Sequence, residues 1–214
     1  MEVPATVTEF ARNLPCERCG TLVPRHDLTH FTTETGASEL CTLCFNADVA
    51  QRSGIDDFDN HPLDPVFITS ADGVIHEFHL RTRLLGAIVT LEAYELKDHA
   101  PSGYQFQLVG EPDEDRFVQL GRLVERIRRT LATTYLEDGR TGLQIKDMEV
   151  KGTIEADLSD DTDLVGSSAP MLVIDGRDVS WEEFGRMLMT FEGFQFKLEI
   201  VDKSDDLGSR GGLY

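Results

Sequence analysis

Alternation between hydrophobic and polar residues predicts a series of β-strands through the middle of the chain. The runs "PVFIT" (65–69) and "VIHEFHLRTRLL" (74–85) alternate on either side of Asp72-Gly73, a pair typical of hairpin turns. "AIVTLEAYEL" (87–96) and "GYQFQLV" (103–109) alternate in the same way. Because short turns join these runs, we expect a mostly antiparallel sheet with one apolar and one polar face.

The histidines of the second run fall on opposite faces of this sheet. A turn at Leu85-Gly86 places His79 opposite Glu92, and we expect these two side chains to pair across the strands. His76 lies on the apolar face, where we expect a hydrogen-bonded core histidine. The string "HEFH" does not resemble a metalloprotease helix, because on a strand its two histidines point apart.

Hydrophobic residues recur at helical spacing in two places. A first helix within residues 111–139 buries a predicted stripe of Phe117, Leu120, Val124, Ile127, Leu131 and Tyr135. A second helix follows Ser180, which forms a capping box with Glu183, and ends before Gly193. Its predicted stripe consists of Trp181, Phe184, Leu188 and Phe191. Both helices are amphipathic, so each is expected to pack against a sheet.

The end of the chain also alternates. "FQFKLEI" (194–200) predicts a strand with Phe194, Phe196, Leu198 and Ile200 turned inward, and Met171–Ile174 predicts a buried strand. Together, these patterns indicate an α+β fold: a mostly antiparallel sheet packed with two amphipathic helices.

All four cysteines lie before this region, in two CxxC pairs with the spacing C-x2-C-x21-C-x2-C. Cys16, Cys19, Cys41 and Cys44 supply the four thiolates of a structural zinc site, so we expect one Zn²⁺ per chain. His26 and His30 lie between the pairs, but four thiolates already complete the tetrahedron. Gly20 follows the first pair at a tight knuckle, two short strands come next, and the second pair opens a helix. Disulfides and a thioredoxin-like redox pair fit this pattern less well.

The order of knuckle, hairpin and helix resembles the treble-clef class of zinc fingers over about residues 14–54. This resemblance implies that the four cysteines are the zinc ligands. It leaves function open, because treble clefs serve protein-binding, nucleic-acid-binding and purely structural roles. The C-terminal block, residues 170–202, resembles the C-terminal part of a group of uncharacterised bacterial proteins. In that group this part sometimes follows a cysteine-paired finger.

Composition shifts divide the chain into four parts. We expect a four-cysteine finger at 1–54, a linker rich in Asp, Gly and Pro at 55–65, an α+β domain at 66–203 and a disordered tail at 204–214. The N-terminus lacks the pattern of a signal peptide, and no apolar run is long enough to span a membrane. We therefore expect a cytoplasmic protein.

The net charge of −19 repels phosphate backbones and anionic membranes, which argues against nucleic-acid and membrane partners. The first helix is the exception, because Arg122, Arg126 and Arg129 share one of its sides. These arginines either dock an anionic partner or balance local acidic charge.

The sequence contains no phosphate-binding loop, dinucleotide turn or nucleophile elbow. We therefore expect no catalytic site, and a zinc-stabilised adaptor or regulatory protein whose partners are proteins is the leading hypothesis. One alternative is an enzyme that uses carboxylates and His79 on the polar face of the sheet. The other is nucleic-acid binding through the finger and the arginine-rich helix.

Overall fold

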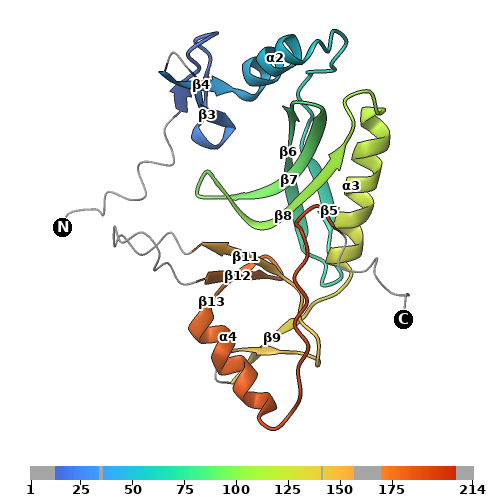
Figure 1. The fold of residues 1–214 in the computed structure, drawn as a ribbon. Coiled ribbons are helices and arrows are strands. Elements are labelled where there is room, and N and C mark those ends of the chain that lie inside the picture. Colours follow the sequence, from blue (N-terminus) through green and yellow to red (C-terminus); the bar gives the residue numbers. More distant parts are fainter. Residues whose placement is uncertain (1–12, 34–35, 141, 157–169, 206–214) are drawn as a thin grey trace, which may run out of the picture.

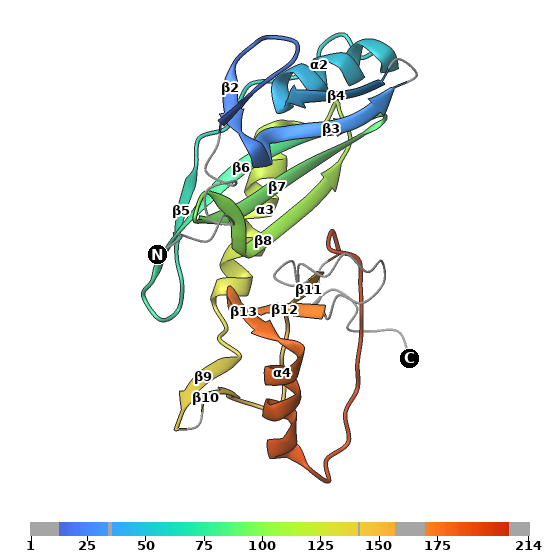
Figure 2. The ribbon, with the colours of Figure 1, turned by 90° about the vertical axis from the view of Figure 1, so that its left-hand side faces the viewer.

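The computed structural model describes residues 13–33, 36–140, 142–156 and 170–205. They form three tiers, which Figures 1 and 2 show one above another: a cysteine-containing finger, a central sheet covered by a helix, and a C-terminal lobe. The fold is mixed α and β with mostly antiparallel sheets and few helices, as predicted in outline. Among the described residues, no helix has the length and apolar character needed to cross a membrane.

The finger (residues 13–53) contains two hairpins followed by a helix. Strand β1 pairs with β2 and β3 pairs with β4, all antiparallel, and a 3-10 turn, η1, separates the two hairpins. Helix α2 begins directly after β4 and is followed by Gly54, whose positive φ of 68° suits glycine. The bounds are β1 Asn13–Pro15, β2 Leu22–Pro24, η1 Arg25–Asp27, β3 Leu28–Thr33, β4 Gly36–Cys41 and α2 Thr42–Ser53.

The central tier (residues 66–131) is a four-stranded antiparallel meander with one helix on its apolar face. Its strands lie in chain order, β5 Val66–Thr69, β6 Ile75–Leu85, β7 Ile88–Lys97 and β8 Ala100–Gly110. Each predicted strand of this region is present, and Gly73 occupies the predicted turn with φ of 85°.

The register between β6 and β7 differs from the predicted one. Leu85 pairs with Ile88, so the turn is Gly86-Ala87 and His79 lies opposite Tyr94 instead of Glu92. A two-residue hairpin needs positive φ near its centre, and Gly86 provides it with φ of 69°. Moving the turn by one residue changes each cross-strand partner by two positions without changing the face of any side chain.

Helix α3 (Arg116–Leu131) begins at Asp115, whose carboxylate accepts hydrogen bonds from the amides of Phe117 and Val118. The predicted stripe is wrong at its first member, because Phe117 is 76% exposed in the first turn. Leu123, which the prediction left out, is fully buried. The stripe that packs on the sheet therefore begins one turn later than the sequence pattern indicated.

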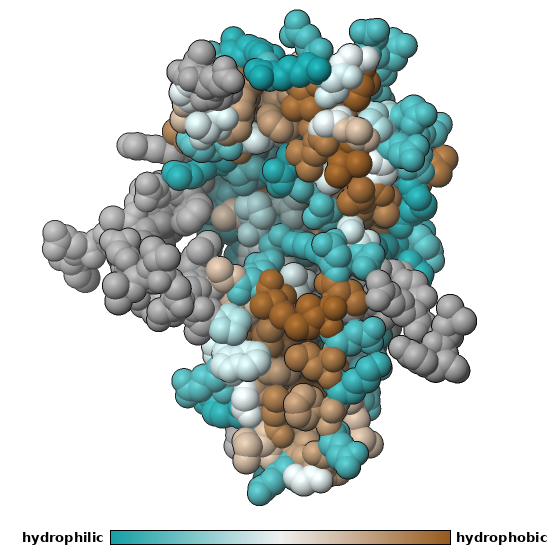
Figure 3. All heavy atoms as spheres, viewed as in Figure 1, coloured by the Kyte–Doolittle hydropathy of each residue, from teal (hydrophilic) through white to brown (hydrophobic). Residues whose placement is uncertain are grey.

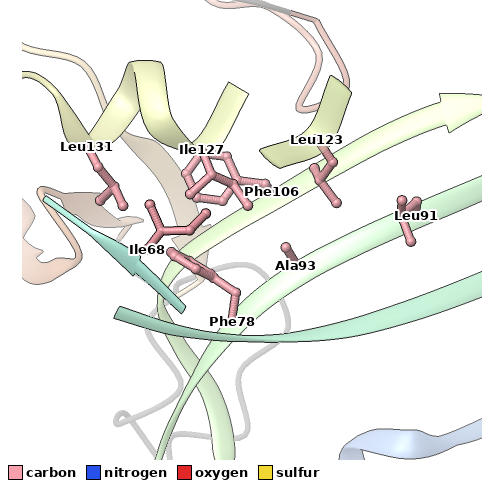
Figure 4. Packing of buried hydrophobic residues seen from close by; sticks show 8 residues of the cluster. All are labelled: Ile68, Phe78, Leu91, Ala93, Phe106, Leu123, Ile127 and Leu131. Carbon is pink, nitrogen blue, oxygen red and sulfur yellow. The ribbon is translucent and has the colours of Figure 1, made fainter. Parts of the chain in front are cut away.

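The core between α3 and the sheet is shown in Figure 4. Leu123, Ile127 and Leu131 point from the helix toward the sheet, with Ile127 beside Phe106 of β8 and Leu123 over Ala93 of β7. Tyr104 and Leu108 of β8 also pack against this cluster. The residues predicted as a linker, 55–65, form no helix or strand, yet Ile55 and Phe58 pack where α2 meets the β6–β7 hairpin.

The C-terminal lobe (residues 135–205) has its own hydrophobic cluster, formed by Leu136, Ile145, Ile174, Val179 and Met187. It contains a β9–β10 hairpin, the sheet β11–β12–β13 and one short helix, α4. The turn between β12 and β13 is Asp175-Gly176, with both φ values positive. The bounds are β9 Leu136–Gly139, β10 Gly142–Ile145, β11 Thr153–Ala156, β12 Pro170–Ile174, β13 Arg177–Ser180, α4 Trp181–Leu188 and the 3-10 turn η2 Met189–Phe191.

Two predictions for this lobe are wrong in part. The Oγ of Ser180 caps α4 as expected, but Trp181 and Leu188 are 54% and 45% exposed, and Met187 is the buried residue of the helix. Residues 194–200 form no strand, and their side chains are exposed. Alternation shows which face a strand would bury, but it does not supply a neighbouring strand. Figure 2 shows this segment running apart from β11–β12–β13.

The predicted domain boundaries stay a prediction, although residues 66–203 contain two separate hydrophobic clusters. Residues 1–12 of the predicted finger and 206–214 of the predicted disordered tail lie outside the described part of the chain.

Candidate metal centre

The four cysteines meet at one point of the finger. Their Sγ atoms all lie within 4.8 Å of one another, and all four are free thiols. The Sγ atoms of Cys19 and Cys41 are 3.9 Å apart. Cys16 and Cys41 are buried, Cys44 is half-buried and Cys19 is exposed. Folding therefore brings the two CxxC pairs together, as a shared metal site requires.

A knuckle and a helix start position these thiols. Between β1 and β2, the amide of Gly20 donates to the carbonyl of Cys16 at 2.9 Å, and the amide of Cys16 donates to the carbonyl of Thr21 at 2.9 Å. Gly20 has φ of 71°, a conformation that favours glycine. Cys41 ends β4 and Cys44 lies in the first turn of α2, so one strand-to-helix corner carries the second pair.

Burial and hydrogen bonding shift the thiol pKa values in opposite directions. Burial raises the pKa of Cys16, but backbone hydrogen bonds, including one of 3.3 Å from the amide of Cys41, outweigh it and lower the pKa to about 6. Burial raises the pKa of Cys41 and of Cys44, and the neighbouring thiols raise the pKa of Cys44 further. A cation among the sulfurs would favour all four thiolates at once.

The donors fit a metal ion bound by four sulfurs. In a tetrahedral site with metal–sulfur bonds of ~2.3 Å, neighbouring sulfurs are ~3.8 Å apart. The distance between Cys19 and Cys41 is close to this value. Val23, Phe31 and Phe45 pack against the cluster that contains Cys16 and Cys41, and the rings of Phe31 and Phe45 meet edge to face at 5.8 Å.

The finger is docked on the polar face of the central sheet through Arg81 of β6. This guanidinium donates to the carbonyl of His26 in η1, and its Nε donates to the carboxylate of Glu92 at 2.8 Å. It also lies 5.2 Å from the ring centre of Tyr94. The hydroxyl of Tyr94 donates to Asp27 at 3.4 Å. One arginine therefore links the sheet, an aromatic residue and the finger.

A buried asparagine makes a second link between the tiers. Asn46 of α2 is 1% exposed, and its amide nitrogen donates to the carbonyl of Thr82 at 2.9 Å. Its amide oxygen accepts from the amide of Leu84 at 2.9 Å. Strand β5 pairs with β6 only as far as Phe78, so this side chain satisfies part of the β6 edge that β5 leaves open.

His79 does not stand in an open site. Its ring stacks on Tyr94 with centres 6.2 Å apart, and its Nε2 lies 3.5 Å from the carboxylate of Glu77. Glu92, the predicted partner, instead pairs with Arg81 and Arg83, at 2.6 Å each. His76 forms the hydrogen bond expected of a core histidine, 2.7 Å from Glu95.

Two of the three arginines considered for partner binding or charge balance on α3, Arg122 and Arg126, contact groups of this chain. Arg122 pairs with Glu114. Arg126 donates to the carbonyls of Lys203 and Ser204, at 3.0 and 2.8 Å, and so holds the end of the described chain against α3. Arg122, Arg126 and Arg129 do share one surface, because all three line the same shallow depression together with Ser204.

Sequence reasoning missed the residues that connect the tiers. No feature of the sequence indicates that Asn46 is buried between the tiers, since an asparagine inside a helix is normally exposed or a cap. Arg81 lies on the polar face that the alternation predicts for the sheet, but the finger that covers this face is distant in sequence. Tyr94 would have been found beside His79 if the turn had been placed at Gly86-Ala87.

Three family models match the chain, one on each tier. Residues 15–56 are similar to a Domain of unknown function (DUF7685), residues 59–132 to a Domain of unknown function (DUF7686), and residues 135–205 to a Domain of unknown function (DUF7713). Comparison with curated proteins found no match. Comparison with solved structures also found none.

Proposed function

We propose that the chain is a zinc-stabilised interaction protein, an adaptor or regulator whose partners are proteins. The observation that carries this proposal is the cluster of four free thiols within 4.8 Å. Four thiolates complete a tetrahedral site and leave no position for a water or substrate, so the metal stabilises the finger and takes no part in catalysis. Zinc is the ion that such a donor set most commonly holds.

The surroundings of the thiols support a finger of the treble-clef type. A knuckle carries Cys16 and Cys19, the β3–β4 hairpin follows, and Cys41 and Cys44 stand at the start of α2. This is the order of elements on which the sequence resemblance rests.

Contacts within the chain weigh against the two alternatives. An enzyme centred on His79 would need the polar face of the sheet to be open, whereas Arg81 and Tyr94 of this face contact η1 of the finger. Nucleic-acid binding would need free arginines on the finger and on α3. Arg18 pairs with Asp48 of the finger, and Arg126 holds the chain's own carbonyls. A protein partner is consistent with the strongly acidic chain. The cytoplasmic location expected from the sequence stays part of this proposal.

Metal analysis tests the first part of the proposal. Protein purified without added metal is expected to contain about one equivalent of zinc, because one tetrahedral site uses all four thiolates. Removing zinc with a strong chelator should make all four thiols reactive toward a thiol reagent. The proposal would be contradicted if the protein, as purified and before any chelator is added, were folded, free of metal and reactive at all four thiols.

Affinity capture followed by mass spectrometry tests the second part. We expect specific proteins to be recovered, with a recovery that nuclease treatment does not change. Leu22→Ser in the finger and Phe117→Ser in α3 then compare two surfaces, since these side chains are 63% and 76% exposed and both variants should fold. Recovery of nucleic acid that survives high salt, or turnover by the purified protein, would contradict an interaction role.

A further inference from the structure

The segment after α4 has the composition of a strand, but no strand of the described part of the chain pairs with it. We define the unpaired segment as residues 194–201. Its apolar residues are among the most exposed of the described chain, with Phe194 at 66%, Phe196 at 90%, Leu198 at 72% and Ile200 at 69%. Among the described residues, none forms a backbone hydrogen bond with residues 195–201. Both the apolar side chains and the backbone groups of the unpaired segment therefore face water.

The unpaired segment is held at both ends, by the C-terminal lobe at its start and by helix α3 at its end. At its start, the amide of Phe194 donates to the carbonyl of Phe191, which packs on the core of the C-terminal lobe. At its end, Arg126 of α3 binds the carbonyls of Lys203 and Ser204. The chain between these anchors spans from one tier to the next (Figures 1 and 2). Anchoring keeps this stretch extended, which lowers the entropic cost of pairing it with another strand.

An exposed surface of this kind marks a contact site. Figure 3 shows hydrophobic side chains gathered over the C-terminal lobe on the face drawn in Figure 1. A row of four large apolar side chains with free backbone groups is the normal template for strand addition, which satisfies both at once.

The charges of the unpaired segment indicate which kind of strand can pair with it. The unpaired segment has two charged residues, Lys197 and Glu199, and is therefore neutral within a chain of net charge −19. Antiparallel pairing with an identical segment about Leu198 sets Lys197 of each copy opposite Glu199 of the other. The same register sets Phe196 opposite Ile200 on the other face. Moving the two-fold axis by one residue, to position 197 or 199, shifts the register by two residues and brings Lys197 or Glu199 opposite itself, so like charges oppose these registers. A one-residue shift of the register places both charged side chains opposite apolar ones.

We propose that residues 194–201 pair antiparallel with the same segment of a second copy of this chain, across a two-fold axis through Leu198. Two copies related by a two-fold axis present the same surface to each other, so an antiparallel pair of identical strands meets the symmetry requirement. The neutral segment allows contact where the rest of the acidic surface repels. The proposal is independent of the metal site.

Sedimentation equilibrium with charge-reversed variants tests both the dimer and its register. Lys197→Glu places Glu opposite Glu, and Glu199→Lys places Lys opposite Lys. Each single variant should weaken dimerisation by roughly tenfold or more, because two favourable pairs become two repulsive ones. An equimolar mixture of the two variants should form heterodimers, since all four charges are then matched, and the double variant K197E/E199K should dimerise as the wild type does. Lys146→Glu, an equal charge change at another exposed position of the lobe, should leave the dimer intact.

The variants are expected to fold, because the side chain of Lys197 is 84% exposed and that of Glu199 is 51% exposed. Three results would overturn the proposal. The first is a wild-type protein that stays monomeric from micromolar to millimolar concentration. This result counts against the proposal whatever protection hydrogen exchange shows for residues 194–201. The second is a dimer unaffected by both single reversals, which would place the interface elsewhere. The third is a mixture of the single variants that remains monomeric, which would exclude this register.

Discussion

At the scale of single residues, Asn46 is the side chain on which the docking of the finger most depends. Asn46→Ala leaves the carbonyl of Thr82 and the amide of Leu84 without their side-chain partner in a buried place. We expect a loss of roughly 2–4 kcal/mol in the free energy of unfolding, because each buried group left unsatisfied costs about 1–3 kcal/mol. Urea denaturation measures it.

Asn60→Ala is the matched control for this prediction. Asn60 donates to the carbonyl of Leu43 and accepts from Asn46, but its bond to Leu43 is exposed to solvent. Loss of the Asn60 side chain should lower the free energy of unfolding by clearly less, about 1 kcal/mol. Equal losses from the two variants would show that the edge of β6 does not rely on Asn46.

His26 should make the stability of the docked finger depend on pH. Burial against the sheet lowers the pKa of His26 below its ordinary value of 6.5, and this effect outweighs the charge of Asp27. The folded state therefore binds fewer protons than the unfolded state just below that value. Its stability falls as the pH drops through 6.5.

Comparison with His26→Gln isolates this contribution. Protonation of the cysteine thiolates also destabilises the finger in acid, but it affects both proteins alike. The wild type should lose more stability than the variant between about pH 7 and pH 5 in thermal unfolding. Parallel curves would mean that His26 is not held neutral by the sheet.

At the scale of elements, helix α3 offers a direct comparison between a buried and an exposed large side chain. Leu123→Ala removes a fully buried side chain from the cluster with Phe78 and Phe106, and should cost about 2–5 kcal/mol. Phe117→Ala, in the same helix, should change stability by no more than about 0.5 kcal/mol, because its ring is 76% exposed. A large loss from the second variant would mean that the predicted stripe was correct after all.

Periodicity predicted most elements of this fold because hydrogen bonds within a hairpin or helix are local. The strands β5 to β8 and the helices α3 and α4 each satisfy their backbone close by in the chain. The same reasoning failed for residues 194–200, because a strand needs a neighbouring strand and the described residues on either side of this segment supply none. It also failed for Phe117 and Trp181, because a helical pattern does not tell where the covering sheet ends.

The candidate site was predictable to a similar degree. Spacing alone identified Cys16, Cys19, Cys41 and Cys44, because two CxxC pairs have few other uses in such a chain. It could not show which surface the finger would cover. That contact depends on Arg81 and Asn46, whose partners are separated from them by 55 and 36 to 38 residues, respectively.

At the scale of the whole molecule, the three tiers differ in how they are stabilised. The central tier and the C-terminal lobe each have a hydrophobic cluster of their own, whereas the finger's cluster consists largely of the cysteines and the residues around them. We therefore expect the finger to depend on the proposed metal and on the sheet beneath it. Loss of the metal should unfold the finger and leave the C-terminal lobe folded.

Cys16→Ser tests this order. The variant removes a buried ligand, so the metal should be lost and the finger should unfold, because small metal domains take most of their stability from the ion. Hydrogen exchange should rise across residues 13–53. It should also rise at Thr82–Leu84, where Asn46 no longer covers β6. Residues 171–191 of the C-terminal lobe should exchange as in the wild type, since their cluster includes no residue of the finger. Exchange that rises equally in all three tiers would mean that they unfold as one cooperative unit.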